Sequence, residues 1–199
     1  SETGRGLVPV VQTEGLAGGE TSNARLTTAT TLTENKQVRS LTIDGGSLEM
    51  ADGVKLTVGD GTNPGGLIVR CPSAEAYSQR VSATAGGEID FGAAEGVIWA
   101  TAADREMYVD FGKTKLTSAK GMTFVGRAGS ASRKAYFRPT RANVNWTGPT
   151  YIEDCVVDIR EGNVNILPVG QDVYVRGNSE YGACLKLTVV PNTTFEGHV

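Results

Sequence analysis

Residues that could perform nucleophilic or acid–base chemistry are few in this 199-residue chain. The single histidine is His198, the next-to-last residue. A serine or cysteine nucleophile needs a base beside it, normally a histidine that a carboxylate holds in place. A histidine at the end of the chain is poorly placed for that role, so we predict no triad of this kind.

Paired carboxylates are the next candidates, because glycoside hydrolases work with two of them. Such clusters occur at Glu88 with Asp90 and at Asp158 with Glu161. Glu88 and Asp90 flank Ile89, and Asp158 also stands between two apolar residues, so the alternation predicts that all three carboxylates face solvent. We therefore expect solvated charges, no catalytic residue and no enzyme activity.

The sequence also gives little support for a metal site or a cofactor. The three cysteines, Cys71, Cys155 and Cys184, show neither a CxxC motif nor a Cys/His spacing. Asp-Gly turns could offer oxygen atoms to a hard cation, but ordinary turns explain these residues without one. We predict neither a metal nor a cofactor.

Basic residues are concentrated in one stretch that contains no Asp or Glu. The eight members are Lys113, Lys115, Lys120, Arg127, Arg133, Lys134, Arg138 and Arg141. Tyr136, Phe137 and Trp146 lie among them, so a cationic face with aromatic platforms could bind an anionic glycan. The same stretch could instead meet the acidic part of a neighbouring molecule, or simply be solvated. With a net charge of −3 for the whole chain, we expect no nucleic-acid partner.

The elements that must position these groups are short strands. The 26 glycines indicate frequent turns, and Gly, Asn, Asp or Pro interrupts the chain every few residues from Val38 onward. Between the turns, apolar residues alternate, as in Leu41 and Ile43, Val97 and Trp99, or Val173 and Val175, which places each pair on one face of a strand. We expect strands at 40–44, 47–50, 55–58, 66–70, 80–83, 88–91, 97–100, 106–111, 114–117, 122–125, 134–138, 143–146, 150–152, 156–159, 163–167, 172–176, 184–189 and 193–196.

Two all-β architectures fit this pattern. A β-sandwich joins matched strands by tight hairpins. Here Asp44-Gly45, Asp52-Gly53 and Asp60-Gly61 recur eight residues apart, and each strand between them holds only one or two inward apolar residues. Such strands suit a solenoid, in which neighbouring coils bury what one coil cannot. We therefore predict a β-solenoid over residues 26–199.

Residues 1–25 differ in character from the rest of the chain. Several glycines surround one apolar run that comprises Leu7, Val8, Pro9, Val10 and Val11. This segment is either an N-terminal arm or cap, or a strand that pairs with an exposed sheet edge of the same or another molecule. Pro9 speaks against the strand, because proline removes a donor from the hydrogen-bond ladder.

One stretch resembles a known repeat. Residues 145–159 are similar to the autotransporter-associated β-strand repeat, with its Asn-x-Tyr-Thr-Gly-x-Thr core followed by an Ile and then a Gly-x-Leu-x-Val strand. Cys155 stands where that repeat usually has Gly. The positions that match are Asn145, Trp146, Thr147, Gly148, Thr150, Ile152, Val157 and Ile159. The phrases at 41–48, 54–61 and 65–69 are similar to other parts of the same bacterial passenger regions, so the resemblance spans about residues 25–190.

The resemblance implies a right-handed parallel β-helix that forms a stalk outside the cytoplasm. In such a solenoid Cys155 and Cys184 lie about one coil apart and could form a disulfide, and two buried thiols fit equally well. We expect an exported extracellular or cell-surface module whose signal is not part of this sequence. No apolar stretch reaches the ~18 residues of a membrane-spanning helix, so no transmembrane segment is expected.

Three functions stay open at this point. The chain is a structural or adhesive module of a cell-surface protein, a subunit that assembles end to end with itself, or a module that binds surface glycans through the basic stretch. The strand Leu7–Val11 is the candidate assembly segment.

Overall fold

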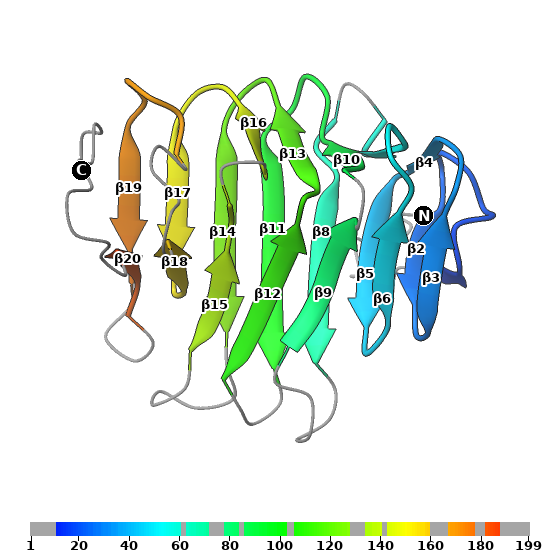
Figure 1. Ribbon diagram of the computed structural model, residues 1–199, viewed down its shortest axis with the longest axis horizontal. Coiled ribbons are helices and arrows are strands. Elements are labelled where there is room, and N and C mark those ends of the chain that lie inside the picture. The colour runs from blue at the N-terminus through cyan, green and yellow to red at the C-terminus, as the bar shows by residue number, and fades with distance from the viewer. Residues whose placement is uncertain are drawn as a thin grey trace, which may run out of the picture.

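The computed structural model describes residues 11–60, 63–71, 78–83, 86–102, 106–127, 134–140, 143–159, 167–177 and 182–187. Within these ranges there are twenty β-strands and no α-helix, and every pair of strands is parallel. Figure 1 shows the strands stacked side by side, with the blue N-terminal strands at one end and the orange C-terminal strands at the other.

Three parallel sheets form the sides of the molecule. The eight-stranded sheet consists, in order, of β1 (Gln12–Glu14), β2 (Asn23–Leu26), β5 (Ser40–Asp44), β8 (Gly66–Cys71), β11 (Gly96–Ala102), β14 (Met122–Arg127), β17 (Thr150–Glu153) and β19 (Val173–Arg176). The seven-stranded sheet consists of β20 (Cys184–Leu187), β18 (Val156–Ile159), β15 (Ala135–Arg138), β12 (Met107–Gly112), β9 (Ser78–Ala83), β6 (Ser47–Met50) and β3 (Ala29–Leu32). The five-stranded sheet consists of β16 (Val144–Trp146), β13 (Lys115–Ser118), β10 (Glu88–Asp90), β7 (Lys55–Val58) and β4 (Lys36–Val38).

The order of the strands confirms the predicted parallel β-helix. From β2 onward, consecutive strands enter different sheets. Each strand from β2 to β15 pairs with the one three positions later in the chain, as β5 does with β8 and β8 with β11, and in the last described coil β17 pairs with β19 and β18 with β20. A β-sandwich would instead pair its strands through hairpins. Each set of three strands is therefore one coil, and the coils stack along a common axis.

In the eight-stranded sheet the core side chains form columns without a shift in register. One column runs the length of the eight-stranded sheet through Ala24, Leu41, Leu67, Ile98, Phe124, Ile152 and Val175. All of these side chains except the last are 0% exposed. Since burying a large apolar side chain contributes roughly 1.5–3 kcal/mol, each coil stabilises the next by covering this row.

Aromatic residues fill the coil formed by β14, β15 and β16. Phe124 comes from the eight-stranded sheet, Phe137 from the seven-stranded sheet and Trp146 from the five-stranded sheet. The ring centroids of Phe124 and Phe137 are 5.1 Å apart, and those of Phe124 and Trp146 are 6.1 Å apart at 71°. The indole Nε1 donates to Thr150 Oγ1 at 3.0 Å, so the polar end of the buried Trp146 is satisfied.

The turns between strands also stack, and glycine is required where they touch. Gly121 has φ +114°, and a Cβ there would lie 2.4 Å from the carbonyl oxygen of Pro149 in the next coil. Across the same corner Met122 N donates to that Pro149 oxygen at 3.0 Å. A larger residue at position 121 would separate the two coils at this corner.

The structure corrects two expectations about individual side chains. Trp99 was expected on the core face together with Val97, but Ile98 and Ala100 are the buried residues of β11, and Trp99 is 44% exposed. Asp158 was expected to face solvent, but its side chain is 1% exposed. The Asp158 side chain points away from the core, as the alternation predicts, and lies beside the guanidinium of Arg138.

The first four strands were not expected from the sequence. β2, β3 and β4 complete the first coil, and β1 pairs with β2 before them. Their inward positions are occupied by small or isolated apolar residues, Ala24, Leu26, Leu32 and Val38, so the alternation is weak there. The predicted strands at 163–167 and 193–196 fall wholly or mostly outside the described residues. No helix among the described residues is long and apolar enough to cross a membrane.

Candidate functional site

The N-terminal edge of the eight-stranded sheet carries the most organised polar cluster in the described structure. β1 lies in register on β2, with Gln12 opposite Asn23 and Glu14 opposite Arg25. All three residues of β1 are exposed, and β1 is the last strand on its side of the sheet. Gly15 N donates to the carbonyl oxygen of Arg25 at 2.8 Å, which ends the strand in a turn.

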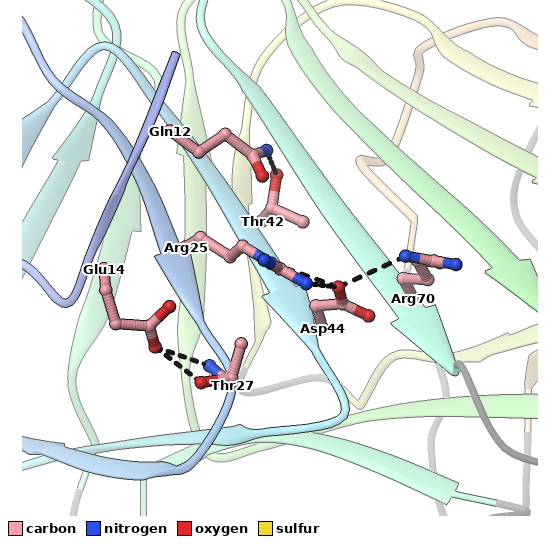
Figure 2. A network of polar contacts seen from close by, with 7 residues as sticks. All are labelled: Gln12, Glu14, Arg25, Thr27, Thr42, Asp44 and Arg70. Carbon is pink, nitrogen blue, oxygen red and sulfur yellow. Dashed lines mark hydrogen bonds and ion pairs between the residues drawn. The ribbon is translucent and has the colours of Figure 1, made fainter. Parts of the chain in front are cut away.

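Two arginines converge on one buried carboxylate beside this edge (Figure 2). Arg25 approaches Asp44 Oδ2 from β2, with its Nε at 3.1 Å, and Arg70 approaches from β8, with Nη1 at 3.2 Å. The Asp44 side chain is only 5% exposed, whereas those of Arg25 and Arg70 are 40% and 53% exposed. The three residues tie neighbouring coils together through one charge-assisted contact.

Hydrogen bonds from the rest of the sheet hold the β1 strand (Figure 2). Gln12 Nε2 donates to Thr42 Oγ1 at 3.0 Å. Glu14 Oε1 accepts from Thr27 N at 3.0 Å and from Thr27 Oγ1 at 2.7 Å. These two hydrogen bonds, the side-chain one first, lower the pKa of Glu14 below its ordinary value, because they stabilise the charged form. Glu14 is therefore an ionised, oriented carboxylate on an exposed sheet edge.

The predicted assembly segment Leu7–Val11 lies directly before this edge in the sequence. Leu7, Val8 and Val10 lie outside the described residues, so their proposed role stays a prediction. Val11 is described and is 82% exposed. The strand that the structure shows is Gln12–Glu14, whose polar sequence carries no apolar alternation, and the only signal for it was its position directly after the apolar run.

The basic stretch is spread over three sides of the solenoid. Lys113 and Lys120 lie in turns on either side of β13, and Lys115 lies on β13 itself, in the five-stranded sheet. Arg127 ends β14 in the eight-stranded sheet, while Lys134 precedes and Arg138 ends β15 in the seven-stranded sheet. Arg133 and Arg141 lie outside the described residues. The described members thus form no single cationic face, and glycan binding through them stays a prediction.

Arg138 has a defined structural environment. Its guanidinium carbon lies 3.7 Å from the centroid of the Tyr108 ring, and its Nε is 3.5 Å from Asp158 Oδ2. Tyr108 stacks on Tyr136 with 4.9 Å between the ring centroids. The contact with Asp158 and the stacking on Tyr108 engage this arginine within the molecule, which reduces what it can offer to a ligand.

Neighbours also engage the carboxylates of Glu88 and Asp90, whereas Glu161 lies outside the described residues. Lys55 Nζ lies 2.9 Å from Asp90 Oδ2 and 3.4 Å from Glu88 Oε2, and Thr117 Oγ1 donates to Glu88. Since Lys55 lies on β7 and the acids lie on β10, the cluster joins adjacent coils. No group of three or more His, Cys, Asp or Glu residues able to hold a metal ion occurs in the part of the chain that the structure describes.

The cysteines give no settled pairing. Cys155 is buried, and as a thiol its Sγ donates to the carbonyl oxygen of Phe124 at 3.3 Å. In the parallel register Cys184 lies opposite Val156, one residue from Cys155. The side chain of Cys184 lies outside the described structure, so the disulfide stays a prediction. Cys71 is buried at the end of β8.

Comparison with known proteins adds no relative: no family model matches this chain, and neither the curated proteins nor the solved structures contain a match. The functional assignment therefore rests on the β-solenoid architecture, which suggests a structural module.

Proposed function

We propose that this chain is a non-enzymatic structural module of an extracellular or cell-surface protein, a stiff spacer like the β-helical stalk of a bacterial autotransporter passenger. The observation that supports it best is the column from Ala24 to Val175, which crosses every coil without a shift in register. Loops of different length leave the column unbroken, because each coil returns to the same strand position. A rod built in this way keeps its two ends at a fixed distance.

The placement of the polar residues is consistent with this role. Asp44 between Arg25 and Arg70, and Asp158 beside Arg138, use their charge to join neighbouring coils. Asparagine does the same at a corner: Asn143, 0% exposed, donates through Nδ2 to the carbonyl oxygens of Gly112 at 3.1 Å and Thr114 at 2.6 Å. These contacts hold neighbouring coils together, and a spacer that is pulled at its ends requires such contacts.

The extracellular location rests on the resemblance of residues 145–159 to the autotransporter repeat. In the structure this stretch comprises the end of β16, all of β17 and all of β18, together with the turns that join these strands. Trp146 and Ile152 of the stretch are core residues, at 3% and 0% exposure, and Gly148 makes a turn at φ +84°. The matching residues therefore serve coil formation, which is the property that a stalk needs.

The distance between two spin labels, measured by pulsed electron paramagnetic resonance, tests the proposal. Thr31→Cys and Asp172→Cys place labels at exposed positions near the two ends, with the wild-type chain as the control for labelling at native cysteines. Since stacked strands are about 4.8 Å apart, the six steps from β2 to β19 predict labels about 30 Å apart along the axis. A narrow distribution supports a stiff spacer; a broad one, similar to that of the urea-unfolded chain, would contradict it.

A further inference from the structure

Large apolar side chains are exposed mainly at the two ends of the solenoid. The exposed members among the described residues are Val11 at 82%, Trp99 at 44%, Val169 at 59%, Tyr174 at 40% and Val175 at 38%. Val11 immediately precedes β1, Tyr174 and Val175 lie in β19, and Val169 lies in the turn before β19. Exposed apolar side chains gathered at both ends of a rod indicate contact surfaces.

β1 and β19 are the two outer strands of the same eight-stranded sheet. Val175 belongs to the inward column, in which Ile152 directly before it is 0% exposed. Its 38% exposure shows that the described residues cover the column less completely at that end than the preceding coils cover one another. A strand placed beside β19 would bury Val175 and use the backbone groups of its open edge.

The register of the sheet decides which residues would meet if a second copy supplied that strand. The outward column that begins at Gln12 ends at Tyr174, and the column that begins at Glu14 ends at Arg176. Continuing the ladder from β19 of one copy to β1 of the next thus places Glu14 opposite Arg176. One residue earlier, the inward-facing Thr13 meets Val175.

The charges at these two positions are complementary. Arg176 is 66% exposed, and its only carboxylate contact given by the described structure is Glu153 at 3.8 Å. Glu14 is oriented on the opposite end by Thr27 and is ionised at neutral pH. Further along the strands, Val11 and Val173 would meet on the inward side. Opposite charges and apolar positions therefore match in one and the same register.

We propose that a second copy of this chain docks head to tail, with the β1 edge of one copy paired in parallel with the β19 edge of the other. The contact joins two different surfaces, so it does not close on itself and leads to end-to-end chains of molecules. Docking of the two ends is a property separate from the spacer role, because a rod can be stiff whether or not its ends associate.

Sedimentation velocity over a concentration series, combined with a charge swap, tests the docking. The wild-type chain is expected to form end-to-end oligomers as its concentration rises. Glu14→Arg and Arg176→Glu should each weaken this association by about tenfold or more, since each places like charges opposite each other. The double variant, or an equimolar mixture of a chain that carries only Glu14→Arg with one that carries only Arg176→Glu, should recover association.

Lys113→Glu provides the matched control, because it reverses an exposed charge on a central coil and should leave association unchanged. Circular dichroism and thermal melting of each variant check that the fold is retained. A wild-type chain that stays monomeric at every concentration overturns the proposal, as does association that none of the reversals weakens. A stiff monomer in the spin-label measurement would leave the spacer role intact while ending this inference, so the two failures can be told apart.

Discussion

At the scale of single residues, the polar groups that matter most are those that bridge coils from inside. Asn143 is the clearest example, because its buried amide donates to two carbonyl oxygens of the preceding coil and its Oδ1 accepts from Thr140 N. Buried carbonyl groups without a donor cost about 1–3 kcal/mol. The side chain thus substitutes for backbone hydrogen bonds at a corner where the ladder is interrupted.

Asn143→Ala is therefore expected to lower the free energy of unfolding by about 1–3 kcal/mol, because the carbonyl groups of Gly112 and Thr114 lose the amide as a donor and Gly112 keeps the hydroxyl of Thr140 at 3.3 Å. Asn145→Ala is the matched control: it removes one exposed hydrogen bond, to Thr117 Oγ1, and should cost roughly 0.5 kcal/mol or less. Urea unfolding followed by circular dichroism measures both. Equal losses in the two variants would show that Asn143 does not bridge the coils.

Lys55 predicts a dependence of stability on alkaline pH. The hydrogen bond to Asp90, followed by the charges of Asp90 and Glu88, raises the pKa of Lys55 above its ordinary 10.5 although partial burial opposes this. A raised pKa in the folded state gives stability that is fully present below pH 10.5 and is lost as the pH rises through the folded value.

Lys55→Met should remove this contribution. The difference in urea midpoint between the wild type and the variant is expected to be constant at neutral pH and to shrink above about pH 10.5, where the lysine of the unfolded chain loses its proton before that of the folded chain. Tyrosine ionisation affects both proteins equally and cancels in the difference. A difference that stays constant to the highest pH at which both proteins fold would contradict the assigned role of Lys55.

At the scale of elements, the outer side of the seven-stranded sheet carries a ladder of alternating charge. Asp110, Arg138, Asp158 and Lys186 occupy one column in β12, β15, β18 and β20. The two Asp158 oxygens lie 3.5 Å from Arg138 Nε and 3.9 Å from Lys186 Nζ. A shift of one residue between coils would break these contacts, so the ladder favours the observed register.

Arg138→Met should destabilise the fold by about 3 kcal/mol or more, because it removes the guanidinium that lies 3.5 Å from the buried Asp158 carboxylate. The double variant that also carries Asp158→Leu should recover most of the loss, since neither charge then remains buried. Lys36→Met, which breaks the exposed pair with Glu34, is the control and should cost less than about 1 kcal/mol. If the double variant is no more stable than Arg138→Met alone, Asp158 is not an uncompensated charge.

The strands could be predicted wherever apolar residues alternate with polar ones. β5, β6, β7 and β18 have the expected bounds, and Leu41, Leu56 and Val157 of these strands are fully buried. β11 shows the limit: Val97, Ile98, Trp99 and Ala100 are all apolar, so the pattern fits either face. The sequence alone does not tell which face neighbouring coils will cover.

The candidate site was less predictable than the fold. The basic stretch is continuous in the sequence, but a coil turns through three sheets, so neighbours in the chain point to different sides. Residues such as Gln12, Thr42, Arg25 and Asp44 come together only through the stacking of coils. These contacts depend on the register between coils, and the residue pattern within a single strand does not specify that register.

At the scale of the whole molecule, the solenoid is a rod, and each stacked coil adds to its stability. Each coil contacts only its neighbours, so the interfaces between coils carry the load when the ends are pulled. The buried columns run along the described solenoid, and charged contacts join neighbouring coils at Asp44, Asp90 and Asp158. Mechanical resistance along the axis is thus the property that follows most directly from the fold.

Pulling a single molecule by its two ends tests this claim most directly. We expect abrupt force peaks separated by extensions of about one coil or a few coils, because each rupture breaks one interface between coils and releases the residues of the detached coil. Arg138→Met should lower the force of at least one of these peaks, and Lys36→Met should not. Smooth extension at low force, without discrete ruptures, would contradict mechanical resistance of the solenoid along its axis.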